Sequence, residues 1–315
     1  MVKVDLITGF LGSGKTTFIR TYASWLIKQG YHIGILENDF GAVNVDMMLL
    51  QDLEGDRCEL EMVSGGCDRD CHRRRFKTKL IAMGMSGYDR VLVEPSGIFD
   101  VDEFFDVLHE EPLDRWYEIG NVLAVVDAKL EPKLSVEADY LLATEVADAG
   151  IVLLSRTQES SQEQIRETKA HLNRALEQVG CSRRLKDMEI LEKNWAELSD
   201  GDFQQLLSCG YVPSDYEKAD MEEDQIFDSL FFMHLCLPVD ELKRRVEAVF
   251  RDPACGSPFR IKGFMQVDGD GWIELNATRH ETVIRPISRG QEILIVIGER
   301  LCKGAVKAYF PEAGV

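Results

Sequence analysis

The amino-acid sequence predicts an α/β protein in which a doubly wound parallel sheet is followed by a smaller α+β domain. Through about the first 190 residues, short apolar runs alternate with amphipathic helical patterns, which is typical of βαβ units. A glycine-rich turn at residues 9–17 joins the first apolar run to the first helical pattern, as in parallel sheets that hold phosphate. After about residue 228 the pattern changes to short strands separated by turns, which favours an antiparallel sheet.

Five apolar runs are the expected strands of the first domain: residues 2–7, 32–36, 90–93, 122–126 and 151–154. The segment 16–29 is expected to be helical, because Phe18, Tyr22 and Leu26 recur at helical spacing. The segment 163–179 has the same character, with Ile165 and Leu172 apolar among charged residues. Strands and helices therefore alternate, and the strands are expected to run parallel.

The C-terminal part has a different pattern. Residues 229–236 form a strand candidate, and Pro238 opens a helix that is expected to reach residue 250. Four further strands are expected at 259–267, 272–276, 281–285 and 292–297. Residues 187–228 separate the two patterns and contain 13 acids against two lysines. The predicted organisation is therefore a first domain at 1–186, an acidic connector at 187–228 and a second domain at 229–315.

Composition and charge narrow the class of protein. The chain has 315 residues, 45% of them hydrophobic and 29% charged, which is typical of a globular protein of about two domains. Its formal net charge of −19 disfavours nucleic acid and anionic membranes as partners. No apolar run approaches the roughly 18 residues of a membrane span, and residues 1–10 resemble a strand more than a signal peptide. A cytoplasmic protein is expected.

The strongest chemical signal is the loop Gly-Phe-Leu-Gly-Ser-Gly-Lys-Thr-Thr at residues 9–17, which fits the pattern G-x-x-x-x-G-K-[ST]. Its glycines let successive backbone N–H groups point at phosphate oxygens beside the N-terminus of the following helix. Lys15 is expected to reach the β- and γ-phosphates, and the Thr16 hydroxyl is expected to bind Mg²⁺. The expected nucleotide contacts in this loop are Gly9, Gly12, Ser13, Gly14, Lys15, Thr16 and Thr17.

Other polar residues follow the expected strands, at the edge where open parallel sheets bind ligands. Residues 37–41 are Glu-Asn-Asp-Phe-Gly, and residues 94–97 are Glu-Pro-Ser-Gly. Asp127 closes the fourth expected strand, and Ser-Arg-Thr-Gln at 155–158 follows the fifth. Glu94 is the expected carboxylate partner of Mg²⁺, oriented through water or acting on the attacking water. The Gly97 N–H is the expected donor to the γ-phosphate.

These motifs resemble the CobW-type branch of the P-loop GTPases, which are relatives of the nickel-insertion proteins HypB and UreG. The matching residues are 9–17, 37–41, 94–97, Val-Val-Asp-Ala at 125–128, Arg-Ile-Lys-Gly-Phe at 260–264 and Ile-Val-Ile-Gly at 295–298, so the resemblance covers nearly the whole chain. It implies GTP hydrolysis coupled to metal delivery, or to maturation of a metal- or cobalamin-dependent protein. It also implies that Lys15 and Thr16 bind phosphate and Mg²⁺, that Asp39 lies in the first switch, and that Glu94 and Gly97 form the second.

The sequence departs from that family in its cysteine motif. The family has Gly-Cys-x-Cys-Cys, whereas residues 66–72 are Gly-Cys-Asp-Arg-Asp-Cys-His. Cys67 and Cys71 share a face if the segment is helical, and with His72 or Asp70 they could bind Zn²⁺, Ni²⁺ or Co²⁺. The adjacent arginines favour instead a reactive thiol or an anion contact, and plain structural cysteines are the third alternative. The basic run at 73–79 predicts a solvated helix face, with a γ-phosphate-sensing arginine as the alternative.

A second departure concerns the nucleotide base. GTPases bind guanine through Asn-Lys-x-Asp, whose carboxylate accepts hydrogen bonds from N1–H and the 2-amino group. The corresponding residues here are Ser155, Arg156 and Gln158, so one amide carbonyl replaces two carboxylate oxygens. Loss of the charge-assisted bond weakens guanine selectivity by about 1.5–3 kcal/mol. The resemblance favours GTP, while ATP or relaxed specificity stays open.

The sequence thus predicts a two-domain, Mg²⁺-dependent P-loop NTPase that assists a metal- or corrinoid-containing client protein. Catalysis is expected from Lys15, Asp39, Glu94 and Gly97, with Mg²⁺ bound by Thr16, Asp39 and Glu94 and a second metal ion by Cys67 and Cys71. Two alternatives are a nucleotide-gated client-binding module without metal carriage and, less favoured, a small-molecule P-loop kinase. Whether the chain forms a homodimer stays open.

Overall fold

A parallel sheet and an antiparallel sheet form two separate units of the chain, Met1–Ala219 and Asp220–Val315. The computed structural model describes residues 1–10, 12–39, 46–65, 69–95, 101–216, 227–235, 237–267, 271–287 and 290–310, without the side chains of residues 39, 46 and 69. Each unit has a hydrophobic core of its own.

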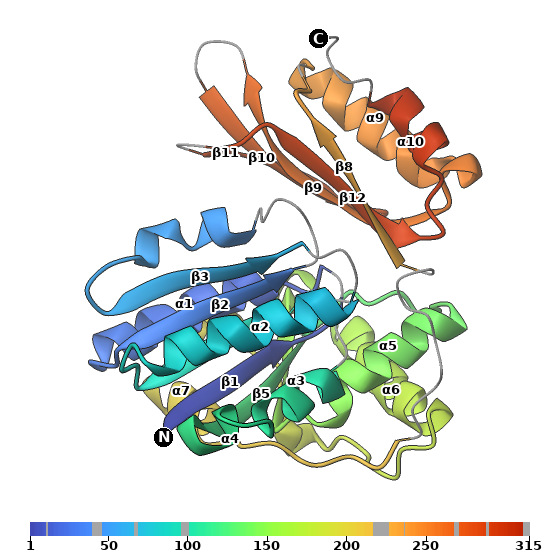
Figure 1. Cartoon of the computed structure of the whole chain (residues 1–315). Coiled ribbons are helices and arrows are strands. Elements are labelled where there is room, and N and C mark those ends of the chain that lie inside the picture. The colour runs from blue at the N-terminus through green and yellow to red at the C-terminus, as the bar shows by residue number, and fades with distance from the viewer. Residues whose placement is uncertain are drawn as a thin grey trace. The chain divides into compact units, whose positions relative to one another are not determined.

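The first unit is built on a seven-stranded sheet in the order β3-β2-β4-β1-β5-β6-β7 (Figure 1). Its strands are β1 (Val2–Thr8), β2 (Ile33–Asp39), β3 (Cys58–Ser64), β4 (Arg90–Pro95), β5 (Tyr117–Asp127), β6 (Ile151–Ser155) and β7 (Ile190–Leu191). All neighbouring strands pair in parallel. Every residue of β4 and β6 is buried, as expected for strands covered on both faces. The order places β1 and the loop that follows it in the middle of the sheet.

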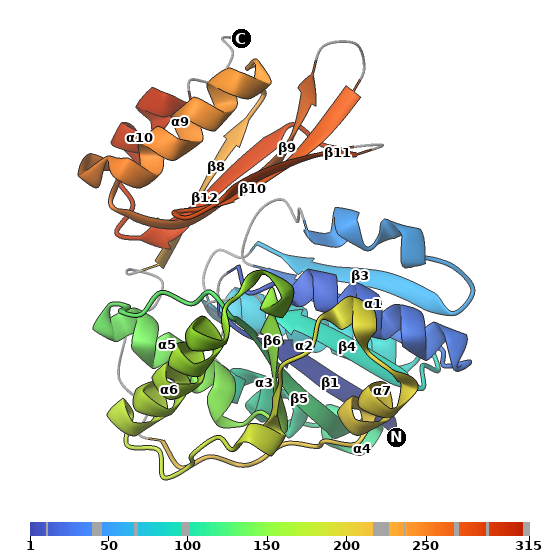
Figure 2. The same cartoon turned by 180° about the vertical axis from the view of Figure 1, so that it is seen from behind.

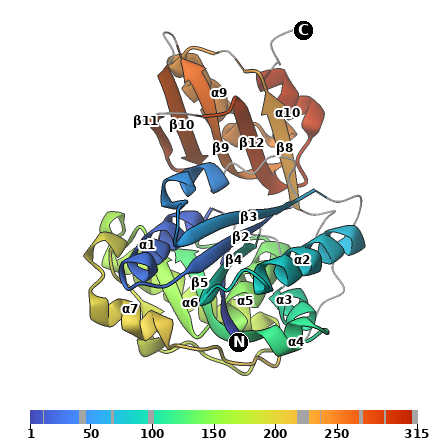
Figure 3. The ribbon, with the colours of Figure 1, turned by 60° about the vertical axis from the view of Figure 1, so that its left-hand side comes forward.

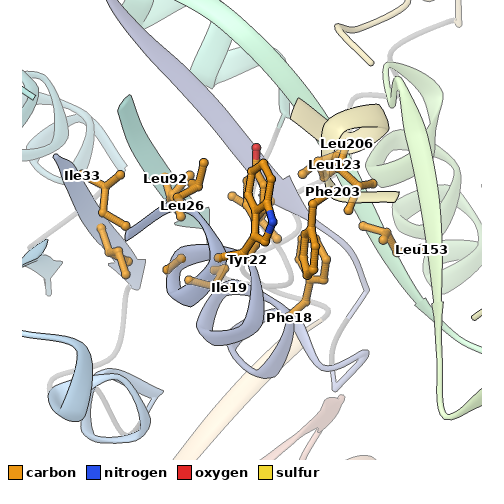
Figure 4. Close-up of a cluster of buried hydrophobic side chains, with 14 of the residues drawn as sticks. Phe18, Ile19, Tyr22, Leu26, Ile33, Leu92, Leu123, Leu153, Phe203 and Leu206 are labelled. Atoms are coloured by element: carbon orange, nitrogen blue, oxygen red, sulfur yellow. The ribbon is translucent and has the colours of Figure 1, made fainter. Parts of the chain in front are cut away.

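Helices cover both faces of this sheet. Figure 1 shows α2 (Arg69–Gly84) and α3 (Val101–Leu108) on one face, and Figure 2 shows α1 (Lys15–Lys28) and α7 (Asp200–Leu207) on the other. Further helical segments are α4 (Leu113–Trp116), α5 (Val136–Ala147), α6 (Gln162–Gln178), η1 (Asp46–Leu49), η2 (Gln51–Leu53), η3 (Thr157–Glu159), η4 (Asp187–Glu189) and η5 (Trp195–Glu197). Phe18 and Tyr22 of α1 pack against strand residues such as Leu123 in the core (Figure 4). The predicted doubly wound parallel sheet is confirmed.

Two strands of this sheet are not found by the sequence analysis. In β3 only Cys58 and Val63 are buried, and glutamates 59 and 61 interrupt the pattern, so no apolar run marks the strand. β7 is only two residues long. Both lie at the sheet edges, where a strand has a neighbour on one side and needs less apolar surface.

The acidic segment expected as a connector is, as far as residue 216, part of the first unit. β7 pairs with β6, and the Phe203 ring of α7 stacks on Trp25 of α1 with 5.1 Å between centroids. Trp25 Nε1 also donates a hydrogen bond to Asp200 at 2.8 Å. The units therefore divide after Ala219, and not at residue 186, because these buried aromatic rings tie the acidic segment to α1.

The second unit is a five-stranded antiparallel sheet in the order β11-β10-β9-β12-β8, with α9 and α10 behind it in Figure 3. Its elements are β8 (Phe227–Met233), α9 (Val239–Arg251), η6 (Pro253–Cys255), β9 (Ser257–Val267), β10 (Gly271–Thr278), β11 (Thr282–Ile287), β12 (Ile293–Glu299) and α10 (Lys303–Tyr309). Leu242 and Val246 of α9 pack on sheet residues such as Ile261 and Leu275. The predicted α+β architecture is confirmed. Among the residues described in either unit, no helix is long and apolar enough to cross a membrane.

Candidate nucleotide-binding site

The carboxyl ends of the parallel strands bring the polar residues of the first unit to one edge of the sheet. The register pairs Glu37 with Glu94 across β2 and β4, and Asp127 with Ser155 across β5 and β6. β1 lies between these two pairs and leads directly into the glycine-rich loop. This is the edge at which open parallel sheets bind ligands.

The backbone of the loop requires glycine at two positions. Gly9 has φ +141°, and a Cβ there would lie 2.1 Å from the carbonyl oxygen of Val125 in β5. Gly14, immediately before α1, has φ +103°, which an L side chain rarely adopts. These glycines allow the loop to turn tightly against the sheet, as a phosphate-binding nest of N–H groups requires.

Two buried polar groups in the loop fit a phosphate. Lys15 is 7% exposed, and its Nζ donates a hydrogen bond to the carbonyl oxygen of Gly9 at 2.7 Å. Ser13 is 2% exposed, and its hydroxyl has no hydrogen-bond partner among the described residues. A phosphate oxygen beside the loop would accept from both groups, which satisfies their hydrogen-bonding capacity and the charge of the ammonium.

Thr16 and Glu94 form the other half of the candidate phosphate site. Thr16 Oγ1 donates a hydrogen bond to Glu94 Oε1 at 2.9 Å, and both residues are buried. Hydroxyl and carboxylate oxygens are ligands that Mg²⁺ prefers, so this pair fits the ion. Asp39 is the last residue of β2, but its side chain lies outside the described part of the chain, and so does Gly97.

His72, on α2, links the ends of β2 and β3. Its ring is 1% exposed, with Nε2 at 2.8 Å from Asn38 Oδ1 and Nδ1 at 3.1 Å from the carbonyl oxygen of Gly65. Both ring nitrogens therefore face protein oxygens, and this arrangement leaves neither for a metal ion. The idea that His72 completes a metal site with the cysteines has no support in this geometry.

The two cysteines expected to bind metal are only partly described. Cys71 lies in the first turn of α2 and is half-buried, and Cys67 falls outside the described residues. Within the described ranges, no group of three or more His, Cys, Asp or Glu side chains could hold a metal ion. The alternatives for Cys67 and Cys71 therefore stay predictions.

Three of the five cations in the basic run on α2 pair with neighbouring acids. Arg73 and Lys77 pair with Glu110 at 2.6 and 2.5 Å, and Lys79 pairs with Glu61 of β3 at 2.7 Å. Hydrogen bonds from Lys77 and then Arg73 hold the pKa of the Glu110 carboxyl below its usual range. The run is a partly exposed helix face in which two acids engage three of the five cations, which favours a solvated helix face over a phosphate sensor.

The residues expected at the base lie beside the phosphate loop. The Arg156 guanidinium pairs with the Asp127 carboxylate, and its Nη2 also donates to the carbonyl oxygen of Gly12 at 3.4 Å. Ser155 is buried, and its hydroxyl has no partner among the described residues. Gln158 lies on η3 and is exposed. Arg156 therefore connects the base loop to the phosphate loop.

Two residues that contact the loop are missed by the sequence analysis. Glu145 of α5 accepts a hydrogen bond from the Gly9 N–H at 2.9 Å. The Trp195 ring edge lies 3.4 Å from the position that a Cβ on Gly14 would take. A single acid within the apolar run of α5 is a signal that could have identified Glu145. Trp195 stands in the acidic segment and carries no comparable signal.

The parallel sheet and its glycine-rich loop define a P-loop NTP hydrolase. The chain belongs to the CobW/HypB/UreG family, whose nucleotide-binding-domain model matches residues 3–181, more than half of the chain. The resemblance noted from the motifs is thereby confirmed.

Individual relatives extend the comparison beyond this domain. The zinc chaperone YjiA of Escherichia coli K12 is 26% identical over 283 residues, which cover 85% of this chain and 83% of YjiA. The zinc chaperone YeiR of the same strain is 27% identical over 186 residues, which cover 59% of this chain and 54% of YeiR. A crystal structure of Zn(II)-bound YjiA GTPase from E. coli is 20% identical, covers 98% of this chain and 97% of that one, and has a TM-score of 0.35.

Proposed function

We propose that this protein is a Mg²⁺-dependent GTPase that carries a divalent metal ion and delivers it to a client protein, or helps a metal- or cobalamin-dependent client to mature. The nucleotide part rests on the hydrogen bond between Thr16 and Glu94 beside the buried ammonium of Lys15. The metal part is supported by relatives named as zinc chaperones, so zinc is the first cargo to test and Ni²⁺ and Co²⁺ follow.

The residues at the sheet edge have distinct roles in this proposal. Lys15 leaves the Gly9 carbonyl to neutralise the β- and γ-phosphates, while the loop N–H groups bind phosphate oxygens. Thr16, Glu94 and Asp39 would hold Mg²⁺, which would supply positive charge to neutralise the phosphates. Glu94 and Asp39 orient the attacking water, and the Gly97 N–H donates to the γ-phosphate. Hydrolysis then relaxes the loops after β2 and β4 and alters the segment around Cys67.

Guanine is the proposed base, with weak selectivity. The exposed Gln158 offers one carbonyl oxygen in place of a carboxylate. Arg156 pairs with Asp127 and donates a hydrogen bond to the Gly12 carbonyl oxygen, so its guanidinium is already engaged by protein oxygens. ATP is therefore the alternative substrate, and the two nucleotides have to be compared directly.

A second candidate function is a nucleotide-gated module that binds its client without carrying metal. It is favoured by the residues at positions 69 and 70, where arginine and aspartate replace the family's two thiols. It is also favoured by His72, whose ring nitrogens are both engaged by protein oxygens. Metal analysis separates the two functions.

The decisive experiment measures GTP and ATP hydrolysis side by side, with and without Mg²⁺ and Zn²⁺. Lys15→Ala is expected to lower turnover at least about 100-fold, because it removes the charge that stabilises the transition state. The matched control is Lys28→Ala, an exposed lysine at the other end of α1, which should hydrolyse like the parent. Unchanged turnover in Lys15→Ala would contradict the assignment of the phosphate site.

The same samples test metal carriage. Stoichiometric zinc on the parent with GTP present, lost in Cys67→Ser/Cys71→Ser, supports a metallochaperone. A parent that hydrolyses GTP but holds no Zn²⁺, Ni²⁺ or Co²⁺ supports the client-binding module instead.

A further inference from the structure

Glu145 is a charged residue in an unfavourable place. It lies on α5, where every residue from 140 to 147 is buried, and it is itself 1% exposed. It also stands in the last turn of that helix, where the negative end of the helix dipole disfavours an anion. A carboxylate buried in this way is destabilising unless specific partners compensate for its lost hydration. Its partners therefore indicate what it does.

The carboxylate reaches out of α5 to the start of the phosphate loop. Glu145 Oε2 accepts a hydrogen bond from the Gly9 N–H at 2.9 Å, although the two residues are 136 positions apart in the chain. On its other side, the Gly9 carbonyl oxygen accepts a hydrogen bond from Lys15 Nζ at 2.7 Å. Gly9 is thus held between a buried carboxyl group and a buried amino group.

The third constraint on Gly9 is the sheet itself. A Cβ on this residue would lie 2.1 Å from the Val125 carbonyl oxygen, so the loop passes as close to β5 as a backbone can. At φ +141° the peptide groups on either side of Gly9 have few steric constraints of their own, because glycine has no side chain. The Gly9 N–H and carbonyl belong to the two peptide groups that flank its Cα, so a partner that holds the N–H limits the rotations that set the direction of the carbonyl and, with it, the resting position of the Lys15 ammonium.

We propose that Glu145 is a positioning residue of the phosphate-binding loop, a role that rests on the nucleotide-binding function proposed above. Its carboxylate holds the peptide group that carries the Gly9 N–H, and the carbonyl of the next peptide group in turn holds the Lys15 ammonium before nucleotide arrives. The loop is thereby preorganised for the phosphates, so binding does not have to order it. Glu145 acts on the nucleotide through Gly9 and Lys15.

Two conservative variants separate the hydrogen bond from the charge. Glu145→Gln keeps the length of the side chain and one acceptor oxygen but removes the negative charge. Glu145→Asp keeps the charge but withdraws the oxygens by about 1.5 Å, the length of one carbon–carbon bond. The Kd of a fluorescent GDP analogue is measured for each in the full chain, together with KM and kcat for GTP. Glu167→Gln and Glu167→Asp, at an exposed position on α6, are the matched controls.

Glu145→Gln is expected to bind within about threefold of the parent, and Glu145→Asp at least about tenfold more weakly, because the bond to Gly9 is lost. The weakening should appear in Kd and KM more than in kcat. A merely structural role would lower the melting temperature of both variants without separating their Kd values. Parent-like binding by Glu145→Asp, or equal weakening in both variants, overturns the proposal. A parent that binds no nucleotide instead overturns the proposed function on which it rests.

Discussion

Asp5, in the middle of β1, is a fully buried carboxylate. It pairs with the Arg90 guanidinium, and Asn121 donates to it from both its backbone N–H at 2.9 Å and its side chain at 2.8 Å. Burial raises the pKa of Asp5, and the adjacent Arg90 opposes that rise. Donors from β4 and β5, the two neighbours of β1, therefore stabilise the carboxylate, and these contacts connect the three central strands.

Removing one charge of this pair should be costly. In Asp5→Asn the Arg90 side chain, 5% exposed, is left buried without its counter-charge, and the free energy of unfolding should fall by about 3–5 kcal/mol. Urea unfolding measures this value. The double variant Asp5→Asn/Arg90→Met removes the stranded charge as well and should recover much of the loss. A fall of less than about 1 kcal/mol in the single variant, typical of an exposed pair, would contradict this account.

At the scale of elements, α7 shows which interactions stabilise a helix within the acidic segment. Ser199 and Asp202 form a capping box, in which each side chain accepts from the other residue's backbone N–H. Phe203 and Leu206 are the buried residues that attach the helix to α1 (Figure 4). Lys193 also binds Asp202 at 2.6 Å. Hydrogen bonds from Lys193 and then Ser199 lower the pKa of Asp202 from 3.8 to about 2.

The lowered pKa of Asp202 makes the stability of α7 dependent on pH. The folded state favours the carboxylate, so its contribution is complete above the ordinary pKa near 3.8 and is lost as the pH falls toward 2. The free energy of unfolding of the parent should exceed that of Asp202→Asn at pH 6, and the gap should shrink by pH 3. Asp114→Asn, at an exposed position of α4, is the control. A gap that is the same at both pH values would show that the carboxylate has no such role.

At the scale of the whole molecule, the two units have separate sheets and separate cores. The phosphate loop and the residues that hold it, Glu94, Glu145 and Arg156, all belong to the first unit. Most of the acidic segment is also part of that unit. The seven acids between residues 187 and 216, against one lysine, therefore belong to the nucleotide-binding unit, and this part of the acidic segment is not a linker.

Separate cores predict two thermal transitions in differential scanning calorimetry. A nucleotide binds only the folded first unit, so GDP with Mg²⁺ should raise the temperature of one transition and leave the other unchanged. At a concentration about 100 times the Kd, the stabilisation should be about 2.7 kcal/mol. The Lys15→Ala variant should show both transitions but no shift with GDP. One cooperative transition, or an equal shift of both, would show that the units unfold together.

Sequence alone determined those features that depend on residues close together in the chain. The glycine-rich loop is a local backbone pattern, so its position between β1 and α1 and the placement of Lys15 and Thr16 follow from residues 9–17. Strands with continuous apolar runs were equally recognisable, because burial on both faces requires such runs. Edge strands β3 and β7 were not, since an edge strand can carry polar residues on one side.

Only the tertiary structure decided which distant residues support the loop. Glu145 and Gly9 are far apart in the chain, and no local pattern pairs them. His72 is a second example. Its position beside Cys71 in the sequence suggested a metal ligand, whereas in the structure its ring is buried and contacts Asn38. The acidic segment is a third example. Its composition predicts a connector, but the stacked rings of Phe203 and Trp25 attach it to α1. Burial and hydrogen bonding depend on which distant segments come together in space, and no local pattern of residues in the sequence reports those contacts.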